Sequence, residues 1–146
     1  MALKASCKKG GLGSKVSLID PDGGDSRFVI NNDNKVPADL QVFVVDGCVI
    51  TSGERCDYLV LPNKTAAVFV ELKGGDVEKG LSQLRSSLNK LATSIKSRSR
   101  YAVLVPTRWP LPHYQLQRAQ DEFRKKLGCK LKVKNLVYSS ACSDWL

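Results

Sequence analysis

The stretch Asp57-Tyr-Leu-Val-Leu61, with the turn Pro62-Asn-Lys64 and the run Ala66-Ala-Val-Phe-Val-Glu-Leu-Lys73, decides the fold. Its apolar runs, 58–61 and 66–73, predict two strands, and the second is apolar on both faces, as in the centre of a covered sheet. Side chains alternate along a strand, so Glu71 and Lys73 share one face. The sequence therefore predicts two carboxylates and a lysine at one end of a paired sheet, where a divalent metal and a phosphate would bind.

A helix is predicted directly after this pair of strands. Asp76 is a suitable N-cap, and apolar residues then recur at steps of three and four up to Ile95, the period of one helix face. Residues 101–105 predict another buried strand, and 114–127 a second helix that Gly128 ends. Lysines alternate with apolar residues from 130 to 134, which predicts a strand near a sheet edge that continues to 139.

The chain before residue 57 predicts strands and turns, without a helix. Residues 16–19, 27–30 and 40–45 have the composition of strands, and Asp46-Gly47 predicts a hairpin turn that leads into residues 48–50. Residues 1–15 are rich in Gly, Ser and Lys and predict a flexible basic arm. Residues 16–146 are then expected to form a single domain.

The charge balance favours a polyanionic partner. The 146 residues include 23 Lys and Arg against 14 Asp and Glu, a net charge of +9. Such an excess favours nucleic acid, through phosphate contacts and counterion release. No apolar run approaches the ~20 residues of a membrane span, and the N-terminus lacks the apolar core of a secretory signal. We therefore expect a cytoplasmic protein without a membrane partner.

The cysteines and the single histidine indicate neither zinc nor a nucleophile. The five cysteines include no C-x-x-C pair and their number is odd, so reduced thiols are expected. His113 lies at a predicted helix start, and no nucleophile motif surrounds any Ser or Cys. A hard metal bound by carboxylates is the kind of metal site that remains.

Asp57, thirteen intervening residues and then Glu71-Leu72-Lys73 form a pattern that resembles the PD-(D/E)xK nuclease superfamily. Cys56 stands where the motif has proline. The resemblance covers about residues 57–107 and implies an α/β fold, with a mixed central sheet flanked by helices and a restriction-endonuclease-like core. It also implies a metal-dependent endonuclease that hydrolyses phosphodiester bonds, in DNA more than RNA. A symmetric dimer is plausible, because cutting both strands requires two sites.

The resemblance also implies roles for individual residues. Asp57 and Glu71 would bind Mg²⁺ or Mn²⁺ together with the backbone carbonyl of Leu72, and Lys73 would orient or help to deprotonate the attacking water. Gln83 on the following helix would position the water or the phosphate. Members of the family usually begin with a helix that supplies a further acidic residue, and the sequence predicts no such helix here. Candidates for that acid are Glu54, Asp46 and Asp39. Lys79 is a second candidate, beside Gln83, for the polar helix residue that faces the metal site. Candidates for binding the nucleic-acid backbone are Arg98, Arg100 and Arg108.

Other interpretations of the same residues stay open. Glu71 and Lys73 can form a solvated ion pair, although such pairs contribute only ~0–1 kcal/mol to stability. The domain can also be a module of the same fold that binds nucleic acid or protein without cutting, or an interaction protein whose charge serves solubility. Trp109 beside Arg108 can stack on an unpaired base or pack onto the domain.

Overall fold

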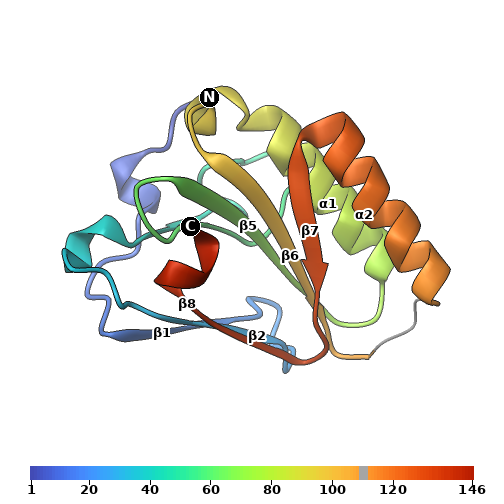
Figure 1. The fold of residues 1–146 in the computed structure, drawn as a ribbon, viewed down its shortest axis with the longest axis horizontal. Coiled ribbons are helices and arrows are strands. Elements are labelled where there is room, and N and C mark those ends of the chain that lie inside the picture. The colour runs from blue at the N-terminus through green and yellow to red at the C-terminus, as the bar shows by residue number, and fades with distance from the viewer. Residues whose placement is uncertain (109–111) are drawn as a thin grey trace.

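A five-stranded mixed sheet forms the centre of the computed structural model, which describes residues 1–108 and 112–146 (Figure 1). The predicted role of Trp109 lies outside the described residues. The first three strands are antiparallel, and the last three run parallel to one another. In spatial order the strands are β3 (Gln41–Val44), β4 (Tyr58–Leu61), β5 (Ala66–Lys73), β6 (Ser99–Pro106) and β7 (Cys129–Val133).

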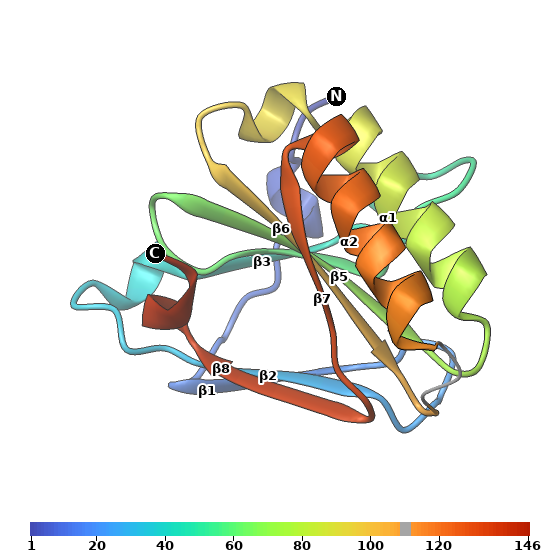
Figure 2. The same cartoon turned by 45° about the vertical axis from the view of Figure 1, so that its right-hand side comes forward.

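Two helices, α1 (Val77–Lys90) and α2 (His113–Leu127), cover one face of this sheet (Figure 2). The predicted cap is present, since the Lys79 amide donates to Asp76 Oδ1 at 3.0 Å. α1 ends at Lys90, before the end of its apolar stripe, and a short 3-10 turn (Thr93–Ile95) buries Ile95 instead. Gly128, in the left-handed conformation at φ 56°, ends α2 as predicted.

A second, three-stranded sheet covers the opposite face. It consists of β1 (Lys15–Ile19), β2 (Arg27–Asn31) and β8 (Val137–Ala141), with β2 between the other two. The central sheet therefore separates two apolar clusters, one beneath the helices and one beneath the small sheet, where Trp145 is buried. The predicted α/β class is confirmed. Both helices lie on one face, however, and a sheet takes the place of helices on the other.

The prediction of one continuous strand over residues 130–139 is wrong. β7 ends at Val133 and pairs with β6, whereas β8 begins at Val137 and pairs with β2 in the other sheet. Leu136 makes the turn between them at φ 66°, a backbone region that residues other than Gly, Asn and Asp rarely adopt. The chain thereby passes from one layer to the next within three residues.

The prediction of a hairpin around Asp46-Gly47 is also wrong in its second strand. Gly47 has the positive φ expected of the turn, at 78°, and its amide donates to the Ile50 carbonyl at 3.0 Å. Residues 48–50 nevertheless form no strand, and β3 pairs with β4 instead. Val49 and Ile50 are buried in the helix-side core, so this turn serves packing more than strand pairing.

The first residues of the chain are attached to the domain. Lys8 forms a β-bridge with Phe43, and the Lys9 amide donates to the Val42 carbonyl at 2.8 Å. Cys7 is buried and forms a disulfide with Cys48, so the prediction that all cysteines are reduced is wrong for these two. Cys56, Cys129 and Cys142 are buried free thiols. Sequence spacing cannot reveal such a pairing, because β3 brings the two cysteines together across 41 residues.

No helix within the described residues is long and apolar enough to cross a membrane. The cytoplasmic location stays a prediction. The disulfide removes one of its premises, because disulfides persist mainly in oxidising compartments.

Candidate metal centre

Asp57 and Glu71 face each other where β4 and β5 meet. Tyr58 pairs with Val70 in the antiparallel register, so one further step places Asp57 opposite Glu71. The Asp57 amide donates to the Val70 carbonyl at 3.1 Å, and the Leu72 amide donates to Asp57 Oδ2 at 2.9 Å. The Asp57 carboxylate is therefore held by the backbone of β5, beside the carboxylate it faces.

Both carboxylates are removed from solvent. Asp57 is 7% exposed and Glu71 only 2%, and Glu71 Oε1 has no hydrogen-bond partner among the described residues. Burial raises the pKa of Glu71 most, and the nearby Asp57 charge raises it further, whereas Lys73 lowers it. Burial also raises the pKa of Asp57, and the hydrogen bond from the Leu72 amide opposes this by lowering that pKa. Two buried carboxylates with one free acceptor oxygen require protons or a cation.

Lys73 lies on the same side of β5 as Glu71, and α1 packs directly over it. A Cβ added to Gly80 would lie 2.7 Å from Leu104 Cδ1 and 3.5 Å from Lys73 Cβ. Glycine at this position therefore allows α1 to lie close to the aliphatic part of the Lys73 side chain, which is itself half-exposed. The first carbons of the Lys73 side chain are thus held by packing, and its ammonium group can reach the solvent-exposed edge of the site.

Asp20 is a further carboxylate near the site that the sequence did not single out. It follows β1, is 7% exposed, and its Oδ1 accepts the Asp22 amide at 2.8 Å. The Tyr58 hydroxyl donates to the Ile19 carbonyl at 2.8 Å, which fixes Asp20 beside β4. Its charge raises the pKa of both Asp57 and Glu71. The motif of residues 20–25 indicates only a turn, and no local signal shows that the small sheet turns Asp20 inward.

Gln83 lies on α1 in a neighbouring polar cavity of about 260 Å³, which Lys79 also lines. Gln83 Oε1 is buried without a partner among the described residues. Asp46 lines the same cavity, and its amide donates to the Asp57 carbonyl at 3.4 Å, so one wall of the cavity is joined to the backbone of Asp57, although neither Asp57 nor Glu71 lines it. Gln83 therefore supplies a second free acceptor at this end of the molecule.

The three candidates for an additional acid are differently placed. Asp46 Oδ1 accepts Arg55 Nε at 2.8 Å, and Glu54 Oε1 accepts the Ser82 hydroxyl at 2.8 Å. Both line the cavity of Gln83, but each already has a partner. Asp39 lies two residues before Gln41, the first residue of β3, which pairs with Leu61 at the far end of β4 from Asp57. Of the three, only Asp46 and Glu54 lie near the site.

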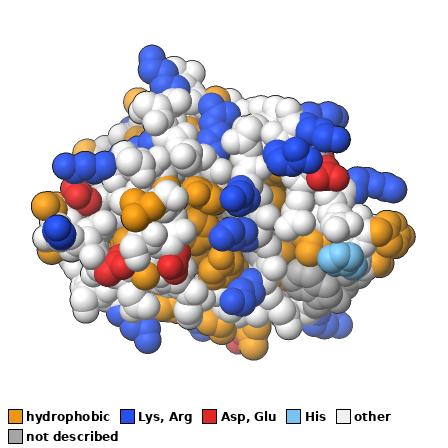
Figure 3. Space-filling model, viewed as in Figure 1, with side chains coloured by type: hydrophobic (Ala, Val, Ile, Leu, Met, Phe, Trp, Pro, Cys, Tyr) orange, Lys and Arg blue, Asp and Glu red, His pale blue; other side chains and the backbone are white. Residues whose placement is uncertain are grey.

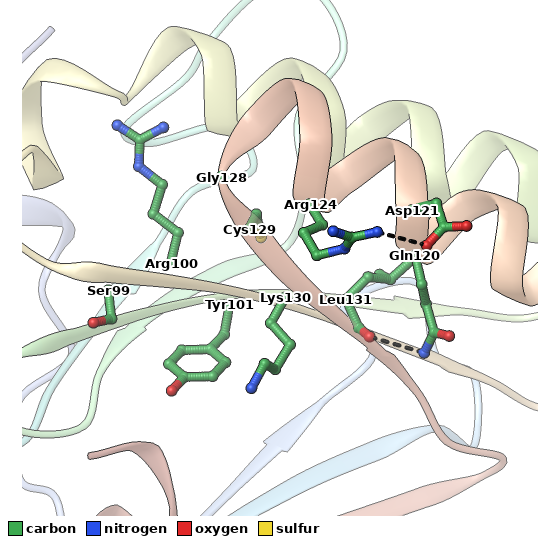
Figure 4. A pocket seen from close by; sticks show the side chains of 10 residues that line it. All are labelled: Ser99, Arg100, Tyr101, Gln120, Asp121, Arg124, Gly128, Cys129, Lys130 and Leu131. Carbon is green, nitrogen blue, oxygen red and sulfur yellow. Dashed lines mark hydrogen bonds and ion pairs between the residues drawn. The ribbon is translucent and has the colours of Figure 1, made fainter.

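The three arginines expected to bind a nucleic-acid backbone lie at opposite ends of the sheet. Arg98 precedes β6 and donates to the carbonyls of Asn63 and Ala66 at 2.6 and 2.9 Å. Arg100 pairs with Ala67 and lines a cavity of about 610 Å³ beside the end of α2 (Figure 4). Arg108 instead lies at the Glu71 end, with a guanidinium nitrogen 3.6 Å from where a Cβ on Gly75 would be.

The donor set fits a hard divalent cation held by few protein ligands. No group of three or more His, Cys, Asp and Glu side chains in the described part of the chain is placed to hold a metal ion. Mg²⁺ is usually bound by one or two carboxylates and keeps several waters or substrate oxygens. The free Glu71 Oε1, opposite Asp57, is the observation that such an ion would explain.

Comparison with protein-family models, with curated proteins and with solved structures finds no match to this chain.

Proposed function

We propose that this protein is a metal-dependent nuclease that hydrolyses phosphodiester bonds, most readily in DNA. The observation that carries the proposal is the pair of buried carboxylates, Asp57 opposite Glu71, with one unpartnered oxygen and Lys73 on the same side. A solvated ion pair does not account for it, since Glu71 is 2% exposed and its free oxygen lacks any partner among the described residues.

The residues of the proposed site divide the tasks between them. Asp57 and Glu71 would hold Mg²⁺ or Mn²⁺, with the Leu72 carbonyl as the third protein ligand. The ion supplies Lewis-acid chemistry, which makes a water more acidic and offsets phosphate charge. Lys73 would orient the attacking water, help to remove its proton and neutralise charge that develops on the phosphate. The free oxygen of Gln83 would accept a hydrogen bond from that water or a neighbouring one.

The order of elements supports this assignment. From Tyr58 to Pro106 the chain forms two antiparallel strands, a helix and a strand parallel to the second, which is the order that the resemblance to PD-(D/E)xK nucleases implies for the acid strand, the E-x-K strand and the elements after them. The net charge of +9 supports a nucleic-acid substrate. A homodimer and a cytoplasmic location remain part of the proposal.

The competing function is a module that binds nucleic acid or protein without cutting. The carboxylate pair argues against it, because two buried acids beside Asp20 destabilise the fold unless an ion or a proton offsets their charge. A domain that only binds through surface lysines has no need for this arrangement.

The test is cleavage of labelled single-stranded, duplex and branched DNA, and of RNA, with Mg²⁺, Mn²⁺ or EDTA. Wild type is compared with Glu71→Gln and Lys73→Ala, and with the exposed controls Glu78→Gln and Lys64→Ala. We expect cleavage that requires metal, persists in both controls and falls by about 100-fold or more in both site variants. Binding without cleavage under every metal would favour the module instead.

A further inference from the structure

The strand β7 carries two lysines on one face, and Lys134, directly after its end, continues the same alternation. Leu131 is buried in the cluster beneath the helices, so the residues that alternate with it, Lys130, Lys132 and Lys134, project on the side of the small sheet. Successive lysines on one face of a strand are about 6.6 Å apart. Figure 3 shows a column of Lys and Arg side chains beside hydrophobic ones in this part of the molecule.

Aromatic rings, and no carboxylates, lie beside the ammonium groups of two of these lysines, Lys132 and Lys134. Lys132 Nζ lies 4.9 Å from the Trp145 ring centroid and 6.0 Å from that of Tyr101, and Lys134 Nζ lies 5.1 Å from that of Tyr138. Among the described residues, none of the three lysines forms an ion pair with Asp or Glu. The row is therefore an ordered positive surface whose charge is not neutralised by the protein.

The row leads toward the candidate metal centre. β7 runs parallel to β5, so its lysines run from the Arg100 end toward the end at which β5 carries Lys73. The Lys134 amide donates to the Leu104 carbonyl at 3.1 Å, and Leu104 is in register with Glu71. Lys134 thus lies two strands from Glu71, although the lysines and Glu71 occupy opposite faces of the sheet.

We infer that the row of Lys130, Lys132 and Lys134 binds the sugar-phosphate backbone of one nucleic-acid strand and guides that strand around the end of the sheet. The inference rests on the proposed function for the cleavage of that strand at the carboxylate pair. Regular spacing, uncompensated charge and direction support a polyanionic chain as the ligand. Lysines that only protect an edge strand from pairing need neither the aromatic supports nor this direction.

Binding in EDTA tests the row apart from cleavage. A variant with all three lysines changed to Gln is compared with the control Lys64→Gln, Lys96→Gln and Lys125→Gln, which removes the same charge from exposed sites elsewhere. Binding of single-stranded and duplex oligonucleotides is measured over a range of KCl concentrations. We expect the row variant to bind about tenfold more weakly and its log–log salt slope to fall by about 2–3 in magnitude, while the control changes less than half as much.

A triple Lys→Arg variant of the row guards against loss of fold and should bind like wild type. The inference is overturned if the Gln variants of row and control weaken binding equally, or if the row variant binds like wild type. With Mg²⁺ and substrate varied up to saturation, the row variant should retain kcat and raise KM. Row-dependent binding without any cleavage would refute the proposed function alone, and cleavage without row dependence would refute this inference alone.

Discussion

The two ends of β5 carry charge in opposite ways. At its beginning, the Arg98 guanidinium donates to the carbonyls of Asn63 and Ala66, and Asn63 Oδ1 accepts the amides of Thr65 and Ala66. At its other end, Glu71 is more deeply buried, yet one of its carboxylate oxygens has no partner among the described residues, and its nearest charged neighbours include a second buried acid.

The contrast separates charge that completes the fold from charge that awaits a ligand. Buried polar groups in folded proteins are nearly always hydrogen-bonded, and an exception has a specific cause such as an ion or a catalytic role. We therefore expect Arg98 to stabilise the turn between β4 and β5, and metal-free Glu71 to destabilise the end of β5. Substitutions at the two ends should therefore change the free energy of unfolding in opposite directions.

The largest effect on stability is expected at the Arg98 end. Arg98→Met keeps the unbranched apolar part of the side chain but leaves the Asn63 and Ala66 carbonyls without their donor. The free energy of unfolding should fall by about 2–4 kcal/mol, measured by urea denaturation, because buried acceptors lose a charged partner. The exposed neighbour Lys96→Met is the control. A loss no larger than that of the control would show that the Arg98 bonds add nothing.

The opposite sign is expected for Glu71→Gln in metal-free protein. Gln is uncharged without taking up a proton on folding, so the substitution should raise the free energy of unfolding at slightly alkaline pH by about 1–3 kcal/mol, while it abolishes cleavage. Urea denaturation in EDTA measures the difference, with Glu78→Gln on the exposed side of α1 as the control. A Glu71→Gln protein less stable than wild type would remove the distinction between the two ends.

The pH dependence sharpens this prediction. The folded state holds the Glu71 proton more tightly than the unfolded state, whose pKa is near the ordinary value of 4.5. Metal-free wild type should therefore lose stability as pH rises above 4.5, by at most about 1.4 kcal/mol per pH unit for this group, until the folded carboxyl has ionised. Glu71→Gln should lose less over the same range, and the two proteins should converge at low pH. Parallel curves in urea titrations would contradict the pKa assignment.

The smallest effect expected is that of the ion itself. Mg²⁺ at ten times its Kd should raise the unfolding free energy of wild type by about 1.4 kcal/mol, or roughly 3–6 °C in Tm. Arg98→Met should show the same increment on a lower baseline, and Glu71→Gln should show little. Thermal denaturation with KCl at equal ionic strength controls for screening. Equal shifts in wild type and Glu71→Gln would place the ion elsewhere.

Local sequence signals predicted the central layer well. The run 66–73 is β5 to the residue, and Asp76 and Gly128 bound the helices as their chemistry requires. The strand pairing of the small sheet was harder to predict, because β2 pairs with β8, which lies far from it in the sequence. The end of β7 was missed since Leu136 has no sequence signature for the left-handed conformation that it adopts.

In the candidate site, too, residues close in the sequence were predicted to be neighbours, whereas contacts between distant residues were not. A short turn fixes the register of β4 and β5, so Asp57 and Glu71 were predictable as neighbours from their positions alone. Asp20 was not, because only the packing of the small sheet brings it there. Charge by itself did not reveal that Arg98 bonds to backbone carbonyls, and the predicted nucleic-acid contacts of Arg98, Arg100 and Arg108 remain predictions.

The parallel pairing of β2 with β8 has a consequence for the order of assembly on the ribosome. β8 and Trp145 are synthesised more than a hundred residues after β2, yet Trp145 packs 6.2 Å from the Phe28 ring and 5.1 Å from that of Tyr101. The part of the helix-covered layer from β3 to β6, with α1, is synthesised well before β8, but the other face of the central sheet is not fully covered until β8 and Trp145 have emerged. Nascent chains stalled before β8 should therefore bind chaperones that recognise apolar surface.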